Sequence, residues 1–357
     1  MDVAQQRLVN QHLVGTPLST PEEVVRWLGA VQAQEYAHAK WALSLRMEPT
    51  TEPVMEQAFK EGRILRTHVM RPTWHFVTSE DIRWLLELTA PRVHAVNAYM
   101  YRKTELDDAI FARSNEVIAK ALQGGNYRTR AELAAELTQA GIVGAEGLRL
   151  TYLVMRAELD GVICSGPRRG KQFTYALIEE RAPDAKTMHR DEALAELTRR
   201  FFTSHGPATI DDFAWWSGLT KADVKAGLEL NRWQLVQEMI GERIYWLAAV
   251  SPSSMAIDTL TAHMLPIYDE YTIAYKNHDD IIDPPAAEKM KEVDLVVFTS
   301  TIEIGGQIVG VWKRTLEKDS VVVETKLFRA LTSGEQQAFN DALWRYGEYL
   351  GLGVVLK

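Results

Sequence analysis

The chain has 357 residues, of which 46% are hydrophobic and 25% are charged, and these values are typical of a globular protein with a sizeable core. A net charge of −8 argues against a globally basic nucleic-acid binder, but it is compatible with a local basic groove. The single cysteine, Cys164, excludes an internal disulfide framework, and the polar N-terminus and the lack of an apolar run of ~20 residues predict a cytoplasmic protein without a membrane span.

Residues 1–124 are predicted to form a first unit of helices with one hairpin. Helices are expected over residues 4–13, 21–31, 34–46 and 52–61, and hairpin strands over residues 64–70 and 74–77. The second helix has a clear start, because Thr20 is a good cap, Pro21 suits the first helical position and Glu23 completes a capping box. A further helical region reaches residue 122, and the glycines at 124–125 predict a boundary.

Two glutamines, Gln32 and Gln34, stand where this second helix is expected to end. Residues two apart point to nearly opposite sides of a helix, but they point the same way in an extended chain. The pair can therefore serve one site only if the helix ends before it, and Gly29 is a residue at which a helix can break. The alternative is a pair of solvated amides on a helical surface.

Residues 125–185 are predicted to form a second unit with a winged-helix arrangement. A capping box at residues 129–132 opens a helix to about residue 140. A second helix follows, with one apolar face formed by Leu148, Tyr152, Met155 and Leu159. Strands at residues 162–164 and 173–177 then flank a glycine-bounded turn that carries Arg168, Arg169 and Lys171. The predicted wing therefore has a basic tip.

Residues 186–262 are predicted to form a third unit of the same kind, and residues 263–357 a different domain. In the third unit, a helix with Leu194, Leu197 and Phe201 precedes two more helix starts and a hairpin over residues 233–247. In the last segment, a polar loop with Pro284-Pro285 leads to strands predicted at residues 293–304, 307–316 and 321–328. A final helix is expected to bury Phe339, Leu343, Tyr346 and Leu350.

Common catalytic signatures are absent from the sequence. We find no glycine fingerprint for nucleotides, no phosphate loop, no zinc-ligand spacing and no Gly-x-Ser-x-Gly element. Asp269 and Glu270 are adjacent and would face opposite ways on a strand, so structural roles are expected for both. No metal and no organic cofactor is predicted.

Basic and aromatic residues concentrate in residues 63–75 and at the wing of the second unit. Such clusters commonly contact DNA phosphates. The residues predicted to contact DNA are Arg66, Arg71, Thr73, His75, Arg168, Arg169 and Lys171. The alternative is that the arginines are solvated surface residues. His68 and His75 would equally suit hydrogen-bonded structural roles.

Four segments of this chain occur together in a known family. They are Val31-Gln32-Ala33-Gln34, residues 66–77, residues 265–271 and residues 310–312. Together and in this order they resemble the AlkZ/YcaQ-type winged-helix DNA glycosylases. The resemblance implies a mainly α fold with β hairpins, built from three tandem winged-helix units and a C-terminal β-barrel-like α+β domain. It also implies that Gln32 and Gln34 are the catalytic residues, because one branch of the family carries Gln-apolar-Gln.

The resemblance implies a function as well, since members of this family excise alkylated purines and some unhook interstrand crosslinks. We expect a monofunctional DNA glycosylase that hydrolyses the N-glycosidic bond of cationic N7- or N3-alkylated purines in duplex DNA, with water positioned by the two glutamines. Nothing in the sequence singles out a desolvated lysine for a lyase mechanism. We expect a monomer. The alternative is a non-catalytic winged-helix DNA-binding protein, such as a transcription regulator.

Overall fold

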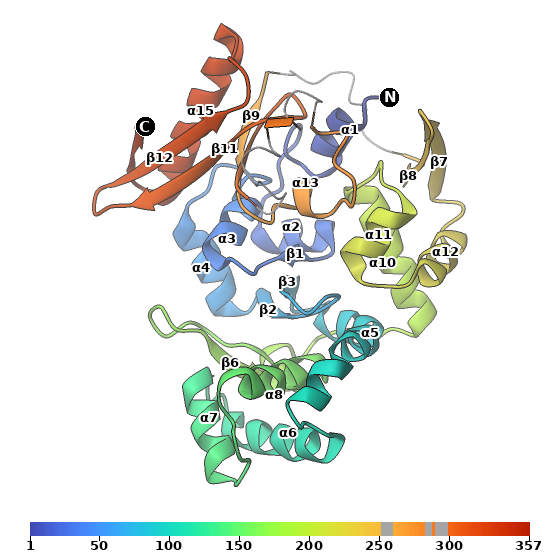
Figure 1. Ribbon diagram of the computed structural model, residues 1–357, viewed down its shortest axis with the longest axis vertical. Coiled ribbons are helices and arrows are strands. Elements are labelled where there is room, and N and C mark those ends of the chain that lie inside the picture. The colour runs from blue at the N-terminus through green and yellow to red at the C-terminus, as the bar shows by residue number, and fades with distance from the viewer. Residues whose placement is uncertain (251–259, 283–287, 290–298) are drawn as a thin grey trace. The chain divides into compact units, whose positions relative to one another are not determined.

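The computed structural model describes residues 1–250, 260–282, 288–289 and 299–357. The fold is a mixed α/β architecture of helices, small sheets and a curled C-terminal half-barrel sheet (Figure 1). The chain divides into two compact units, one of residues 1–55, 195–216 and 220–357 and one of residues 56–194 and 217–219. The four-part division at residues 124, 185 and 262 stays a prediction. Within the described residues, no helix has the length and apolarity needed to span a membrane.

The first unit begins with short helices. Four helices and one short strand come first: α1 (Val3–Asn10), α2 (Pro21–Leu28), β1 (Val31–Gln32), α3 (Tyr36–Ser44) and α4 (Glu52–Glu61). Helix α4 continues into the second unit. The predicted capping box of α2 is present, since Thr20 accepts from the Glu23 backbone and the Glu23 side chain accepts from the Thr20 backbone. The predicted extension of this helix to residue 31 is wrong, because Gly29 takes a positive φ of 85°.

A helical segment with a hairpin follows later in the same unit. Its elements are α10 (Arg190–Ser204), which starts in the second unit, α11 (Ile210–Ser217), α12 (Lys221–Leu230), β7 (Leu235–Ile240) and β8 (Arg243–Ala248). Leu197 and Phe201 of α10 are fully buried, as predicted. The hairpin is confirmed, with Ile240 opposite Arg243 across the turn at Gly241.

The C-terminal part of the first unit is a five-stranded sheet in the order β13-β12-β11-β10-β9. Its elements are β9 (Ala262–Leu265), α13 (Glu270–Ile273), β10 (Thr301–Ile304), β11 (Gln307–Leu316), β12 (Ser320–Leu327), α15 (Ser333–Leu350) and β13 (Gly353–Leu356). Neighbouring strands are antiparallel except β12 and β13. Helix α15 packs on β9, β10 and β13 (Figure 1). Its predicted face is buried at Phe339, Leu343 and Tyr346.

The loop predicted around Pro284-Pro285 and the first part of the strand predicted at residues 293–304 lie outside the described residues.

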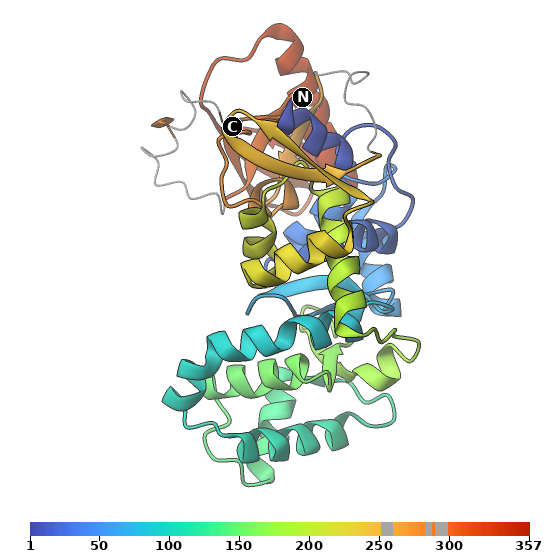
Figure 2. The same ribbon diagram turned by 90° about the vertical axis from the view of Figure 1, so that its right-hand side faces the viewer.

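The second unit combines helices with small sheets. Its elements are β2 (Ile64–His68), β3 (Trp74–Thr78), α5 (Ile82–Lys103), α6 (Asp108–Leu122), β4 (Arg128–Thr129), α7 (Arg130–Gln139), α8 (Gly147–Leu159), β5 (Ile163–Ser165), β6 (Thr174–Leu177) and α9 (Ile178–Arg181). Helix α5 packs against α8, with Val93 and Leu159 in one cluster, and the two helices run side by side in Figure 2. The predicted burial of Leu148 is wrong: it is 51% exposed in the first turn of α8, because the buried face runs through Leu150, Leu153 and Ala157.

Candidate active site

The two glutamines lie on a non-helical segment between α2 and α3. Helix α2 ends at Leu28, Gly29 reverses the chain with a φ of 85°, and Gln32 is the second residue of the extended strand β1. A Cβ on Gly29 would meet a ring carbon of Trp216 at 3.4 Å, and the positive φ disfavours any other residue there. Both glutamines therefore lie beyond the end of the helix, which is required if the pair is to serve one site. Gln32 is only 6% exposed, which does not fit a solvated surface amide.

A buried carboxylate holds the backbone of this segment. The backbone N–H of Gln32 donates to Oε1 of Glu270 over 2.9 Å, and the indole N–H of Trp216 donates to Oε2 of Glu270 over 2.8 Å. His205 lies beside the same oxygen, with Nε2 at 3.4 Å. Burial alone would raise the pKa of Glu270, but His205, the Gln32 amide and the Trp216 indole bring this pKa below its usual value. Glu270 is therefore an ionised, fully buried carboxylate that accepts a hydrogen bond from the Gln32 backbone.

Asp269, the neighbour of Glu270, pairs with Arg46, which lies just beyond the end of helix α3. Its carboxylate accepts two hydrogen bonds from Arg46, at 2.9 Å from Nη1 and 2.8 Å from Nη2. Arg46 Nη2 also donates to Oε1 of Gln11 over 2.8 Å, and the Gln11 amide donates to the Tyr275 hydroxyl over 3.0 Å. Asp269 and Arg46 are both buried, so each charge depends on the other for compensation. These contacts fit the structural roles expected for Asp269 and Glu270.

Sequence reasoning did not connect Glu270 with Gln32. The two residues are 238 positions apart, and no periodicity or local spacing links them. The sign of a link between them in the sequence was that residues 31–34 and residues 265–271 occur together in one family. The structure gives that joint presence a physical reason, because one segment supplies the carboxylate that fixes the backbone of the other.

The β2–β3 hairpin in the second unit holds several of the residues predicted to contact DNA, and two of them are buried. The Arg66 guanidinium lies 4.2 Å from the ring centre of Trp74 and 4.6 Å from that of Phe173. His75 is 1% exposed, its Nδ1 lies 3.0 Å from the Thr73 carbonyl oxygen, and burial together with Arg71 holds its pKa well below the usual value. Arg66 and His75 therefore pack inside this unit, whereas Arg71 and Thr73 are half-buried in the turn.

His68 has the structural role that the sequence left open. Its Nδ1 lies 2.5 Å from Oε2 of Glu158, and both side chains are buried. The pair joins strand β2 to helix α8 within the second unit. The His68 side chain therefore serves to pack β2 against α8.

The basic wing forms the turn between β5 and β6, as predicted. Arg168 pairs with Glu56 at 3.1 Å, and Arg169 pairs with Glu132 at 2.8 Å while donating to the Tyr127 carbonyl oxygen at 2.9 Å. The Thr129 backbone and Arg169 lower the pKa of Glu132 to about 2, so this partner is ionised. Lys171 is exposed. The wing thus presents cations on the surface, although carboxylates already engage its two arginines.

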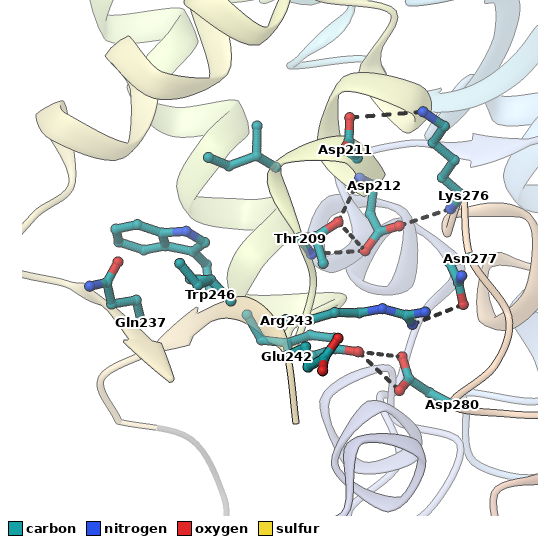
Figure 3. A pocket seen from close by; sticks show the side chains of 13 residues that line it. Thr209, Asp211, Asp212, Gln237, Glu242, Arg243, Trp246, Lys276, Asn277 and Asp280 are labelled. Carbon is teal, nitrogen blue, oxygen red and sulfur yellow. Dashed lines mark hydrogen bonds and ion pairs between the residues drawn. The ribbon is translucent and has the colours of Figure 1, made fainter. Parts of the chain in front are cut away.

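A large cavity of about 650 Å³ lies beside hairpin β7–β8 (Figure 3). Several of its polar side chains are hydrogen-bonded within the lining. The Tyr245 hydroxyl donates to Asp280 over 2.9 Å, Arg243 donates to the Asn277 side-chain oxygen over 3.0 Å, and the Lys276 backbone N–H donates to Asp212 over 2.8 Å. None of the site residues predicted from the sequence lines this cavity.

Comparison with known protein families covers most of the chain. The family model described as DNA glycosylase AlkZ-like matches residues 25–349. The match spans both the Gln32–Gln34 segment and the Asp269–Glu270 segment that holds it. The chain therefore belongs to the AlkZ-like DNA glycosylase family, a family of DNA-repair enzymes that hydrolyse N-glycosyl bonds.

Individual proteins from Streptomyces sahachiroi are similar to this chain. An interstrand DNA cross-link repair glycosylase is 23% identical over 321 residues, which is 86% of this chain and 85% of the relative. The solved structure of S. sahachiroi DNA glycosylase AlkZ matches with a TM-score of 0.83 at 20% identity, over 100% of this chain and 98% of that chain. At this identity the structural likeness shows a shared fold.

Proposed function

We propose that Gln32 and Gln34 form the active site of a monofunctional glycosylase for cationic N7- or N3-alkylated purines in duplex DNA. The observation that carries this proposal is the fixed, non-helical backbone of Gln32, which Glu270 holds through a 2.9 Å hydrogen bond. Family membership supports the reaction class. The name of the 23% identical relative supports extending the substrates to purines in interstrand crosslinks.

The chemistry suits uncharged amide side chains. An N7- or N3-alkylated purine already carries positive charge and leaves without a strong general acid. The remaining tasks are to hold a water molecule near the anomeric carbon and to stabilise an oxocarbenium-like sugar, which carboxylates do in glycoside hydrolases. A glutamine carbonyl is a weaker dipole that can orient water but cannot take up its proton outright. Neutral bases should therefore be poor substrates.

The three helix-and-hairpin segments would provide the DNA-binding scaffold. We propose that residues 1–124, 125–185 and 186–262 are winged-helix units and that residues 263–357 are a β-barrel-like domain. Arg169 and Lys171, together with Arg168, Arg71 and Thr73, would contact phosphates of duplex DNA, while the buried Arg66 and His75 support the hairpin from within. We propose a cytoplasmic monomer, and the buried, reduced Cys164 suits that compartment.

The substrate range tests this function. Duplexes carrying one N7-methylguanine, N3-methyladenine or hypoxanthine are incubated with the protein, and abasic sites are then cleaved with alkali. We expect strand cleavage for the two cationic lesions and little or none for neutral hypoxanthine. Equal release of hypoxanthine would show that the enzyme supplies a strong acid, which two glutamines cannot do.

Replacing the wing cations tests the DNA contacts. The Arg169→Ala, Lys171→Ala variant should weaken duplex binding and reduce the slope of log affinity against log salt by about 0.9 for each phosphate that the wing no longer neutralises. Fluorescence anisotropy over a salt series measures both quantities. Lys120→Ala removes an exposed lysine from α6 of the same unit and should leave the slope unchanged. Equal slopes in wild type and wing variant would remove the wing from the interface.

The role of Glu270 is testable with a nearly isosteric change. In Glu270→Gln, the new amide group must face the N–H of either Gln32 or Trp216, so one hydrogen bond is lost in each orientation. Such a loss costs on the order of 1–3 kcal/mol, and the single-turnover rate on N7-methylguanine should fall about tenfold with DNA affinity unchanged.

A matched control separates this effect from general destabilisation. Glu303 is also fully buried, with Oε2 at 2.5 Å from His263, but it does not touch the glutamine segment. Glu303→Gln should lower the melting temperature without lowering the single-turnover rate of the folded protein. If Glu270→Gln and Glu303→Gln behave alike, Glu270 has no specific role in positioning Gln32.

A further inference from the structure

His205 is a fully buried histidine that faces the carboxylate of Glu270. It follows the last residue of α10, and its ring stacks on Phe201 with centroids 4.8 Å apart and planes within 10° of parallel. The ring of Trp216 lies 5.4 Å away, and the Tyr275 hydroxyl donates to the His205 carbonyl oxygen over 2.7 Å. These contacts fix the ring with Nε2 at 3.4 Å from Oε2 of Glu270. That distance is long for a hydrogen bond, so His205 acts on Glu270 mainly through its charge.

The Ser204 hydroxyl can satisfy His205 in both protonation states. Its oxygen lies 2.7 Å from the Arg200 carbonyl oxygen and 2.8 Å from His205 Nδ1. When His205 is neutral, the hydroxyl donates to Nδ1, and the ring proton sits on Nε2, facing Glu270. When His205 is protonated, Nδ1–H donates to the Ser204 oxygen, and the hydroxyl turns to donate to the Arg200 carbonyl oxygen. The ring can therefore take up a proton without leaving Nδ1 unpaired.

The other charged groups near this histidine compensate one another. Arg46 pairs with Asp269 over 2.8 Å. Arg7 packs on the Tyr275 ring and pairs with Asp280 over 3.2 Å. Burial raises the pKa of Tyr275, so its hydroxyl stays neutral. These groups therefore add no excess charge of their own.

The protonation of His205 thus decides the net charge around Glu270. Among the residues that the structure describes, His205 is the one basic side chain within ion-pair distance of this carboxylate. Burial lowers the pKa of His205 more than Glu270 raises it, so the ring is neutral at physiological pH and takes up a proton on acidification. The pair then changes from one negative charge to none.

We propose that His205 is a positioning residue for base excision, which leaves the Glu270 carboxylate uncompensated when neutral and cancels its charge when protonated. This inference rests on the proposed function. As the bond to a cationic purine breaks, positive charge moves onto the sugar, and a preorganised negative charge stabilises that change. Glu270 contributes through its hydrogen bond to the Gln32 backbone, so base excision should slow when His205 is protonated.

The pH profile of base release tests this role. Single-turnover release of N7-methylguanine by saturating protein is measured between about pH 5 and pH 8, where histidines change their charge, and the rate without protein is subtracted. The wild-type rate should fall about tenfold towards the acid end. In His205→Gln, the neutral side chain replaces the stacked ring, so the rate at neutral pH should be about threefold lower, and the fall towards acid pH should disappear because an amide takes up no proton.

A second variant and a matched control complete the test. Glu270→Gln removes the charge that the His205 proton would cancel, so its lower rate should not fall further on acidification. His263 is another buried histidine of the same unit, with Nδ1 at 2.5 Å from Glu303, and neither residue touches the glutamine segment. His263→Gln should keep the wild-type fall. Melting temperatures at each pH show that every variant is folded during the measurement.

The outcomes separate this inference from the proposed function. A wild-type rate that is constant across this pH range would overturn the role of His205 and leave the glycosylase intact. A fall retained in His205→Gln or in Glu270→Gln, or lost in His263→Gln, would overturn it as well. If the wild type releases no base at any pH, the proposed function fails, and this inference fails with it.

Discussion

The Gln32→Ala, Gln34→Ala double variant should release N7-methylguanine at least about 100-fold more slowly than wild type, the scale of losing one preorganised dipole from an active site. Alanine leaves no side-chain carbonyl to orient water or to face the developing positive charge of the sugar. The non-helical backbone is set by Gly29 and by the contact of Glu270 to the Gln32 backbone N–H, both of which the variant keeps, so it should persist. Single-turnover release followed by alkaline cleavage of abasic sites measures the effect.

The control for this variant is a second pair of glutamines in the same unit. Gln336 and Gln337 are exposed on α15, and a Gln336→Ala, Gln337→Ala variant removes the same number of amide groups from the surface. Its rate should stay within about twofold of wild type. Unchanged base release by the Gln32→Ala, Gln34→Ala variant would show that catalysis lies elsewhere.

The largest effect on stability is expected for Asp269→Ala. Asp269 and Arg46 are 0% and 1% exposed and form two hydrogen bonds, so the substitution leaves a buried guanidinium without its counter-charge. Breaking a buried pair in this way costs about 3–5 kcal/mol. Denaturant unfolding followed by fluorescence measures the loss. Catalysis should fall as well, because Asp269 is the neighbour of Glu270.

An exposed ion pair serves as the comparison for Asp269→Ala. Glu229 accepts from Arg232 at 3.0 Å, with side chains 73% and 57% exposed. Glu229→Ala should change the free energy of unfolding by less than about 1 kcal/mol, because water screens the pair. Equal stability changes in the two variants would mean that the Asp269–Arg46 pair contributes no more than a surface contact.

Local signals predicted much of the fold. Capping boxes placed the starts of α2 at Thr20 and α7 at Thr129, because a cap involves only residues three apart. Hairpins β5–β6 and β7–β8 followed from glycine-containing turns between apolar runs. The strands β9 and β13 were missed, since short strands at the edges of a sheet depend on partners far along the chain.

The site was predictable only in part. Gly29 indicated a residue at which α2 could end, although the helix was predicted to reach residue 31. The Glu270 contact depends on a tertiary arrangement that no local pattern encodes. For the same reason, the burial of Arg66 could not be foreseen, because its partner Phe173 comes from a distant strand–turn segment. Basic residues near aromatic residues indicate either a DNA surface or internal cation–π packing, and sequence spacing does not separate the two.

Direct detection of the released base tests the central claim. A duplex with a single N7-methylguanine is incubated with excess wild-type protein, and the products are quantified by mass spectrometry. We predict free 7-methylguanine together with an intact strand that carries an abasic site and breaks only after alkali, and no base release from the unmodified duplex. DNA that is bound by the protein and yields no free base would contradict the assignment of a glycosylase site to Gln32 and Gln34.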